Sequence, residues 1–248
     1  MQFFVGSERI TVNMTSLSQV QDAVLDRLST GRGFALATLN LDHLAKLAES
    51  PAFRAAYAAQ DLITADGNPI VWMGDLARQS LDLLPGSDLI LPLTRLAVQA
   101  GVAVGLLGST DESLALAAQA LLQAVPGVRI VAQIAPPMGF DPNSADADAM
   151  LDQLDAANVR LCYLALGAPK QEILAARGRL RTPKIGFASI GAGLDFLSGQ
   201  QVRAPYWVRR LALEWLWRMQ SDPRRLMGRY WRAALVLPGH MRASWKQR

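Results

Sequence analysis

The chain has 248 residues, one cysteine and a net charge of +4. A chain of this length with half its residues hydrophobic can bury a sizeable core, as one large domain or one domain with an appendage. The single cysteine, Cys162, excludes an internal disulfide framework and a cysteine-rich zinc site. No run approaches the roughly 18 apolar residues that span a bilayer, and the N-terminus lacks a signal-peptide pattern. We therefore expect a cytoplasmic protein.

Positive charge and tryptophan are concentrated near the C-terminus. Residues 200–248 carry ten arginines and one lysine against Glu214 and Asp222, whereas residues 1–199 carry 14 cations against 19 acids. Five of the six tryptophans lie in the same C-terminal segment. This shift predicts a core of residues 1–199 and a helical, basic and aromatic appendage of residues 200–248.

Short apolar runs alternate with segments of helical periodicity along the core. A small β-hairpin is predicted near the N-terminus, and the first helix begins near Ser16. Buried strands are predicted at residues 34–39, 62–65, 102–107, 128–134, 160–166 and 184–190. Segments 111–124 and 146–157 have the apolar spacing of amphipathic helices. This order predicts an α/β fold with a mainly parallel sheet flanked by helices.

Polar side chains follow the first of these buried strands. Thr38, Asn40 and His43 lie where open α/β sheets commonly bind ligands. Thr38 and Asn40 either contact a sugar or phosphate, or simply cap the next helix, as a single Asn at such a position usually does. His43 has no second histidine or carboxylate at ligand spacing, so a metal role is not expected.

The second strand ends in an aspartate followed by a glycine. Asp66 is the best candidate for a general base, because inverting transfer to a sugar hydroxyl needs one carboxylate to take the hydroxyl proton. Gly67 permits close approach of the backbone, and Asn68 follows it. The alternative is that Asp66 is the N-cap of a helix over residues 68–76.

A glycine-rich turn follows the strand at 102–107. Gly108 precedes Ser109, which with Glu112 predicts a capping box, and a helix N-terminus there is suited to a phosphate. The alternative is that the glycines only form a tight turn. Gly191 and Gly193 lack the third glycine of a dinucleotide fingerprint and are weak support for a nicotinamide cofactor.

Two further motifs carry charge near predicted helix starts. Asp146 and Asp148 have the spacing of a metal-diphosphate site, but their loop enters a helix, where acids favour the helix dipole instead. Lys170, with Gln171 and Glu172, follows a strand end and a proline, so Lys170 is placed to reach an anionic ligand. The alternative for Lys170 is a solvated surface position.

The tail has the spacing of cationic, aromatic helices. One helical face carries Arg210, Glu214 and Arg218, and a following helix, with Asp222 as its N-cap, would align Arg225, Arg229 and Arg232. Such helices suit an anionic membrane surface, and arginines also clamp diphosphates. Nucleic-acid binding is the competing interpretation, because basic residues interleaved with aromatics serve that as well.

Taken in order, these motifs resemble the family 26 glycosyltransferases, the TagA/WecG/CpsF group. The resemblance runs from about residue 34 to 231. The matching segments are TLNLDHL (38–44), ADG (65–67), PGSDL (85–89), LLGS (106–109), LGAPKQE (166–172), GAGLDFLSG (191–199) and RAPYW...LEWLWRMQSDPRRLMGRY (203–230).

The resemblance implies a Rossmann-like core and metal-independent, inverting transfer without a cofactor. It implies a UDP-sugar donor, a polyprenyl-diphosphate-linked acceptor and a tail that reaches the inner face of the membrane, with no nucleic-acid partner. Asp66 matches the catalytic base and Thr38 its neighbour in the site. Arg218 and Arg225, with Arg229 as a less certain match, correspond to residues that contact the donor diphosphate. The expected substrate contacts are Asn40, His43, Gly67, Asn68, Gly108, Lys170, Gln171, Glu172 and these arginines.

The sequence departs from many relatives at two places. Leu81 to Leu84 stand where relatives carry an arginine and a valine, and Ala212 and Leu213 replace Gly-Leu. These changes leave the donor sugar open between N-acetylmannosamine and glucose. The alternatives of another class are a nucleic-acid-binding protein and an NAD-dependent oxidoreductase. The oligomeric state stays open, although an exposed aromatic tail often needs a partner surface as well as lipid, as in a homo-oligomer.

Overall fold

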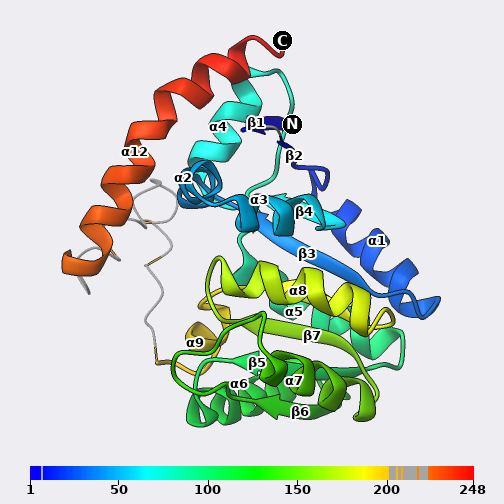
Figure 1. The fold of residues 1–248 in the computed structure, drawn as a ribbon. Helices are drawn as coiled ribbons and strands as arrows, with labels where there is room; N and C mark the ends of the chain where they lie inside the picture. The colour runs from blue at the N-terminus through cyan, green and yellow to red at the C-terminus, as the bar shows by residue number, and fades with distance from the viewer. Residues whose placement is uncertain (7, 201–204, 206–207, 209–216, 218–222) are drawn as a thin grey trace.

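The computed structural model describes residues 1–6, 8–200, 205, 208, 217 and 223–248 (Figure 1). After the hairpin of β1 (Gln2–Val5) and β2 (Glu8–Thr11), helices and strands alternate along the core. The strands of the main sheet are β3 (Phe34–Leu39), β4 (Leu62–Ala65), β5 (Ala103–Gly108), β6 (Ile130–Ile134), β7 (Val159–Ala165) and β8 (Gly186–Ser189). The helices are α1 (Leu17–Ser29), α2 (Leu41–Glu49), α3 (Pro51–Ala58), α4 (Asn68–Leu76), α5 (Gly86–Gln99), α6 (Asp111–Ala124), α7 (Ala145–Ala156), α8 (Lys170–Arg181), α9 (Gly193–Leu197) and α12 (Pro223–Trp245).

The six strands of the main sheet are all parallel and lie in the order β4-β3-β8-β7-β5-β6. This confirms the predicted α/β fold. Every residue of β3, β4, β5 and β8 is buried, as expected for a sheet covered on both faces, whereas the edge strand β6 is partly exposed. All six strands were predicted within a few residues of their bounds.

Helices cover both faces of the sheet, and side chains of alternate strand residues enter the two cores. One core joins α1, α5 and α6 to residues such as Leu36, Leu106 and Tyr163. The other joins α7 and α8 to neighbours such as Ala35, Leu107 and Cys162. This alternation follows from the period of two in a strand.

Local capping explains where several helices begin. Ser16 accepts a hydrogen bond from the backbone N–H of Gln19 at the start of α1, as predicted for the first helix. The cap of α6 is Thr110, which accepts from Ser113, so the predicted capping box of Ser109 and Glu112 is wrong by one residue. Ser109 has a positive φ of 51° and lies in the turn before the cap.

Helix α12 packs against α2, α4 and β1, so the two ends of the chain lie together (Figure 1). Leu237 and Met241 join the core formed by the hairpin and α2 to α4. The side chain of Gln247 donates to the carbonyl of Gln2 at 2.7 Å, and the rings of Phe3 and His240 meet edge to face. None of the helices described is long and apolar enough to cross a membrane. The predicted boundary near residue 200 stays a prediction.

Candidate active site

The sheet order places the carboxyl ends of β4, β3, β8 and β7 side by side. In the parallel register Thr38 of β3 lies beside Thr64 of β4, and Leu39 beside Ala65. The backbone N–H of Asp66 donates to the carbonyl of Leu39 at 2.8 Å, which continues the pairing one residue beyond β4. Asp66 therefore enters the space above the end of β3.

The Asp66 carboxylate is held by two side chains from the end of β3. The Thr38 hydroxyl donates to Asp66 Oδ2 at 3.1 Å, and the Asn40 amide donates to the same oxygen at 3.4 Å. Asn40 also caps α2, because its Oδ1 accepts from the backbone N–H of His43 at 2.9 Å. The capping interpretation of Asn40 is therefore confirmed, and its amide also holds the Asp66 carboxylate. A contact of Asn40 with a sugar or phosphate stays a prediction.

Asp66 does not cap the helix that follows it. The N-cap of α4 is Gly67, which has a φ of 99° and makes no side-chain capping bond. This removes the helix-cap alternative for Asp66. A residue with a Cβ is strained at such a φ, so glycine suits the turn that brings Asn68 to the first position of α4.

A buried ring pair lies behind Thr38. The Tyr57 hydroxyl, on α3, donates to the backbone carbonyl of Thr38 at 2.8 Å, and His43 Nδ1 lies 2.7 Å from the same hydroxyl. Because the Tyr57 hydroxyl donates its hydrogen to the Thr38 carbonyl, it acts as the acceptor for His43, and His43 Nδ1 is assigned as the donor of that second bond. Burial, followed by the charges of Glu172 and Asp66, raises the pKa of Tyr57 well above its ordinary value, so the hydroxyl keeps its proton.

This network changes the expected role of His43. Its side chain is buried and its Nδ1 is bonded to Tyr57, so the structure favours a supporting position under Thr38 over a substrate contact. Tyr57 was missed from the sequence, because nothing in the pattern PAFRAAYA distinguishes a core tyrosine from one that braces a site.

The start of α8 contributes a second group beside the ends of β7 and β8. Lys170 is half-buried, whereas Gln171 and Glu172 are buried. Gln171 Oε1 accepts from the backbone N–H of Gly191 at 3.0 Å, and its Nε2 donates to Glu172 Oε1 at 2.8 Å. Glu172 has no exposed surface, so the expected direct contact with substrate is corrected to a position behind Gln171. Burial raises the pKa of Glu172 from 4.5 to about 7.

The turn after β5 has a structural explanation. A Cβ at Gly108 would lie 2.3 Å from the carbonyl oxygen of Ala165, so glycine permits β5 and β7 to end in close contact. The N-terminus of α6 has Asp111 and Glu112 in its first turn. The hydroxyl of Ser109 donates to Asp195 at 2.7 Å. These carboxylates oppose phosphate binding at this helix end, and a substrate contact at Gly108 stays a prediction.

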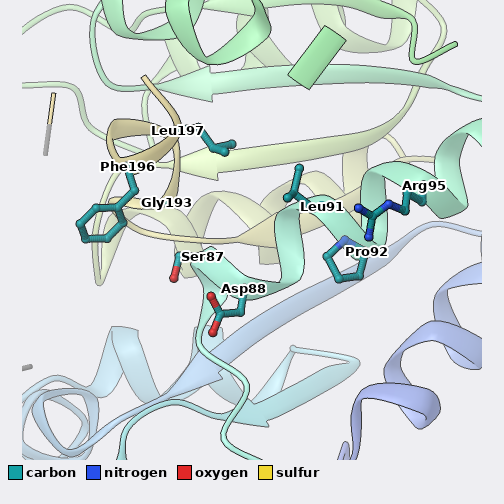
Figure 2. A pocket seen from close by; sticks show the side chains of 8 residues that line it. All are labelled: Ser87, Asp88, Leu91, Pro92, Arg95, Gly193, Phe196 and Leu197. Atoms are coloured by element: carbon teal, nitrogen blue, oxygen red, sulfur yellow. The ribbon is translucent and has the colours of Figure 1, made fainter. Parts of the chain in front are cut away.

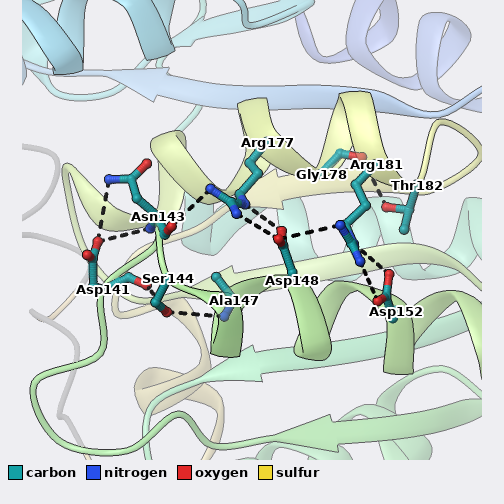
Figure 3. A network of polar contacts seen from close by, with 10 residues as sticks. All are labelled: Asp141, Asn143, Ser144, Ala147, Asp148, Asp152, Arg177, Gly178, Arg181 and Thr182. Carbon is teal, nitrogen blue, oxygen red and sulfur yellow. Dashed lines mark hydrogen bonds and ion pairs between the residues drawn. The ribbon is translucent and has the colours of Figure 1, made fainter.

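Asp146 and Asp148 lie in the first turn of α7, and Asp148 belongs to the network of Figure 3. Asp148 makes two bonds to Arg177 of α8, at 2.6 and 2.8 Å, and lies 3.4 Å from Arg181. Hydrogen bonds from Arg177 lower the pKa of Asp148. Asp148 thus joins α7 to α8. Over the described ranges, no three His, Cys, Asp or Glu side chains are grouped to hold a metal ion.

A pocket of about 370 Å³ lies between α5 and α9 (Figure 2). Its lining combines apolar and polar side chains: Ser87, Asp88, Leu91, Pro92, Arg95, Gly193, Phe196 and Leu197. It is close to the end of β8, because a Cβ at Gly86 would lie 2.8 Å from the Cα of Ile190. The predicted contacts omitted these residues, although PGSDL and GAGLDFLSG were recognised as motifs.

The arginines expected at the donor diphosphate are not placed by the structure. Arg218 lies outside the described residues. Arg225 and Arg229 fall in α12, where their side chains lie outside the described part of the chain. Their roles stay predictions.

An open parallel α/β sheet with polar side chains at its carboxyl edge has the architecture of a ligand-binding α/β protein. The sequence model of the glycosyl transferase WecG/TagA/CpsF family matches residues 7–248, and the chain belongs to this family of glycosyltransferases. It is 27% identical over 246 residues to the N-acetylglucosaminyldiphosphoundecaprenol N-acetyl-beta-D-mannosaminyltransferase of Bacillus spizizenii. That similarity covers 98% of this chain and 88% of the relative.

The bond from Thr38 to Asp66 can be tested with two matched substitutions. Thr38→Val removes a hydroxyl that holds a carboxylate, and we expect kcat/KM for sugar transfer to fall about 10- to 100-fold, the range for hydrogen bonds to charged groups. The control is Thr64→Val, because Thr64 lies beside Thr38 in the register and donates instead to the Leu84 carbonyl at 3.0 Å. It should lower the melting temperature and leave kcat/KM within about 2-fold. Equal kinetic losses in both variants would contradict a specific role for Thr38.

Proposed function

We propose that the protein transfers a sugar from a UDP-sugar to a polyprenyl-diphosphate-linked saccharide, with inversion and without a metal ion. The observation that carries this proposal is the Asp66 carboxylate, held by Thr38 and Asn40 at the carboxyl edge of a parallel sheet. Membership of a glycosyltransferase family supports the reaction class.

Asp66 serves as the general base in this proposal. The acceptor hydroxyl attacks the anomeric carbon on the face opposite the diphosphate, its proton passes to Asp66, and the bond to UDP breaks. Thr38 and Asn40 orient the carboxylate before the acceptor arrives, so less reorganisation is needed as the proton moves. Inversion follows because the displacement is a single step.

The leaving UDP gains negative charge, which must be stabilised. Arg218, Arg225 and Arg229 supply positive charge from the tail in place of a metal ion, since guanidinium groups bind phosphate oxygens in pairs. The pairing of Asp148 with Arg177 and Arg181 supports this, because it occupies one of the two carboxylates of the Asp-x-Asp motif.

The pocket between α5 and α9 is the proposed place of the donor nucleoside. Its volume of about 370 Å³ falls in the range of small-molecule sites. Phe196 offers an aromatic face, and Ser87 offers a polar group at the same opening (Figure 2).

The acceptor is proposed from the relative. The B. spizizenii enzyme is named for transfer of N-acetylmannosamine to N-acetylglucosaminyl-diphosphoundecaprenol. We propose that this chain takes an acceptor of the same kind, in the assembly of a cell-surface polysaccharide. The donor sugar is N-acetylmannosamine or glucose, which a panel of UDP-sugars would separate.

Helix α12 is proposed to bind the inner face of the membrane. Its inner side packs on the core, whereas Met227, Trp231 and Leu235, spaced four residues apart, are 63%, 66% and 65% exposed. Trp245 is also exposed further along the helix. Exposed basic residues also lie in this helix or directly after it, at Arg232, Arg242, Lys246 and Arg248, and helices that lie on anionic lipid combine such charges with apolar side chains.

Replacing the proposed base separates chemistry from binding. Asp66→Asn should lower kcat by at least about 100-fold, the lower range for a lost general base. An asparagine still accepts from Thr38, so the melting temperature and its increase on adding UDP should be retained. UDP, and not NAD, should raise the melting temperature of both proteins. Normal turnover by Asp66→Asn would remove Asp66 as the base.

Metal removal tests how the diphosphate charge is stabilised. Transfer by the purified protein should be unchanged in EDTA and unaffected by added Mg²⁺ or Mn²⁺, because arginines supply the positive charge. The measurement is the initial rate at saturating substrates with and without chelator. A rate that disappears in EDTA and returns with a divalent ion would contradict the proposal.

The exposed stripe on α12 predicts selective membrane binding. The double variant Trp231→Ala/Leu235→Ala should bind vesicles containing anionic lipid more than about 10-fold more weakly, because each large apolar side chain contributes about 1.5–3 kcal/mol on burial. The control is Leu116→Ala/Leu122→Ala, which removes two exposed leucines from α6. Equal losses of vesicle binding in both double variants would exclude α12 as the membrane-binding surface.

Tighter binding to DNA than to vesicles at matched salt would favour the nucleic-acid alternative.

A further inference from the structure

Glu172 is a buried carboxyl group that forms no ion pair with the described part of the chain. It lies in the first turn of α8 and has no exposed surface. Its Oε1 accepts from Gln171, whereas its Oε2 has no hydrogen-bond partner among the residues that the structure describes. When it is charged, a buried carboxyl group of this kind lowers the stability of the fold. Its presence at this position therefore needs a functional explanation.

The carboxyl group is not needed to hold the start of α8. The side chain of Gln60 donates to the backbone carbonyl of Glu172 at 3.1 Å, and the backbone N–H of Gln171 donates to the carbonyl of Gly167 at 3.2 Å. These bonds anchor the backbone of this turn from two sides. Removing the Glu172 side chain should therefore leave the helix in place.

The carboxyl group does decide how the amide of Gln171 is turned. Gln171 donates to Glu172 through Nε2 and accepts from the N–H of Gly191 through Oε1. A flipped amide would place its oxygen against the carboxylate and its NH₂ against another donor, so only one orientation satisfies both neighbours. Gln171 thus bridges the start of α8 and the loop after β8, beside the end of β3 that carries Thr38.

Few charged or titratable groups of the described residues face Glu172. Tyr57 approaches from α3, and its pKa is raised mainly by burial and further by the charges of Glu172 and Asp66. Lys46 approaches from α2 and lowers the pKa of Glu172, but its ammonium group is bonded to Asp42 at 2.9 Å and to the carbonyl of Ala168 at 3.2 Å. The arginines of α8 at 177 and 181 pair with α7 instead.

We propose that Glu172 is a positioning residue for sugar transfer, which fixes the amide of Gln171 and, through it, the loop that follows β8. The inference rests on the proposed function and on the expectation from the sequence that Gln171 contacts the substrate. The second N–H of the Gln171 amide has no bond to the described residues, and a fixed amide presents this donor in one direction.

The ionisation state of Glu172 determines the pH at which its hydrogen bond with Gln171 is strongest. Above its pKa of about 7 the carboxylate accepts a charge-assisted hydrogen bond from Gln171, and below it the neutral acid accepts a weaker one. Stability changes in the opposite sense, because a carboxyl group with a raised pKa stabilises the fold fully below 4.5 and loses that contribution as the pH rises to about 7.

The test compares Glu172→Met, which removes the acceptor, with Glu172→Gln, which keeps an acceptor but does not ionise. Both should be at least as stable as wild type at pH 8, because both remove a buried charge. The side-chain ¹⁵N–H signals of Gln171, assigned by their loss in Gln171→Ala, report the hydrogen bond directly. In wild type they should shift with a midpoint near pH 7, they should not titrate in Glu172→Gln, and they should move to free-amide values in Glu172→Met.

Transfer kinetics supply the second readout. We expect kcat of Glu172→Met to fall about 10-fold with KM for the UDP-sugar changed by less than about 2-fold, the effect of one lost hydrogen bond. Glu172→Gln should restore most of this loss and remove one ionisation from the pH profile of kcat. An unchanged Gln171 signal or an unchanged kcat in Glu172→Met would overturn the proposal. If the wild-type protein used no UDP-sugar, the proposed function would be wrong. The pH titration of the Gln171 signals would still test whether Glu172 fixes the Gln171 amide.

Discussion

The parallel pairing of β3 with β4 is the constraint on which the rest of the site depends. It places Thr38 and Asn40 from one strand beside Asp66 from the next, and the bond from the Asp66 N–H to Leu39 extends the ladder to the residue that carries the carboxylate. Gly67 then turns the chain into α4 at a φ that other residues adopt only with strain. A shift of one residue in this register would turn Thr38 to the opposite face of the sheet.

Support for this edge comes from elements that are distant in sequence. Tyr57 braces the backbone of Thr38 from α3, and His43 braces Tyr57 from α2. Helix α12 packs on the outer sides of α2 and α4, the two helices that begin at the site. The same helix carries the exposed apolar stripe, on residues that the core leaves uncovered.

The fold and the central pair of the site could be predicted because their causes are local. A buried parallel strand is a continuous apolar run, and polar residues that end such a run lie at the ligand-binding edge, which identified Thr38 and Asp66. Burial depends on contacts between distant segments, and a local pattern does not contain them. This is why Glu172 was expected to touch substrate, why Tyr57 was missed, and why Ser109 was predicted as a cap although Thr110 forms it. The pocket between α5 and α9 likewise joins segments about a hundred residues apart.

The buried carboxyl group of Glu172 shows how the fold can oppose its own stability at one position. A pKa raised from 4.5 to about 7 means that the charged form is disfavoured by about 3 kcal/mol relative to an unfolded chain, an order-of-magnitude value. An apolar side chain of similar size would avoid this cost, because Gln60 already anchors the backbone. What an apolar side chain lacks is an acceptor for Gln171, and without one the amide keeps a single anchor at Gly191. The cost in stability is therefore linked to the orientation of one donor at the edge where Asp66 lies.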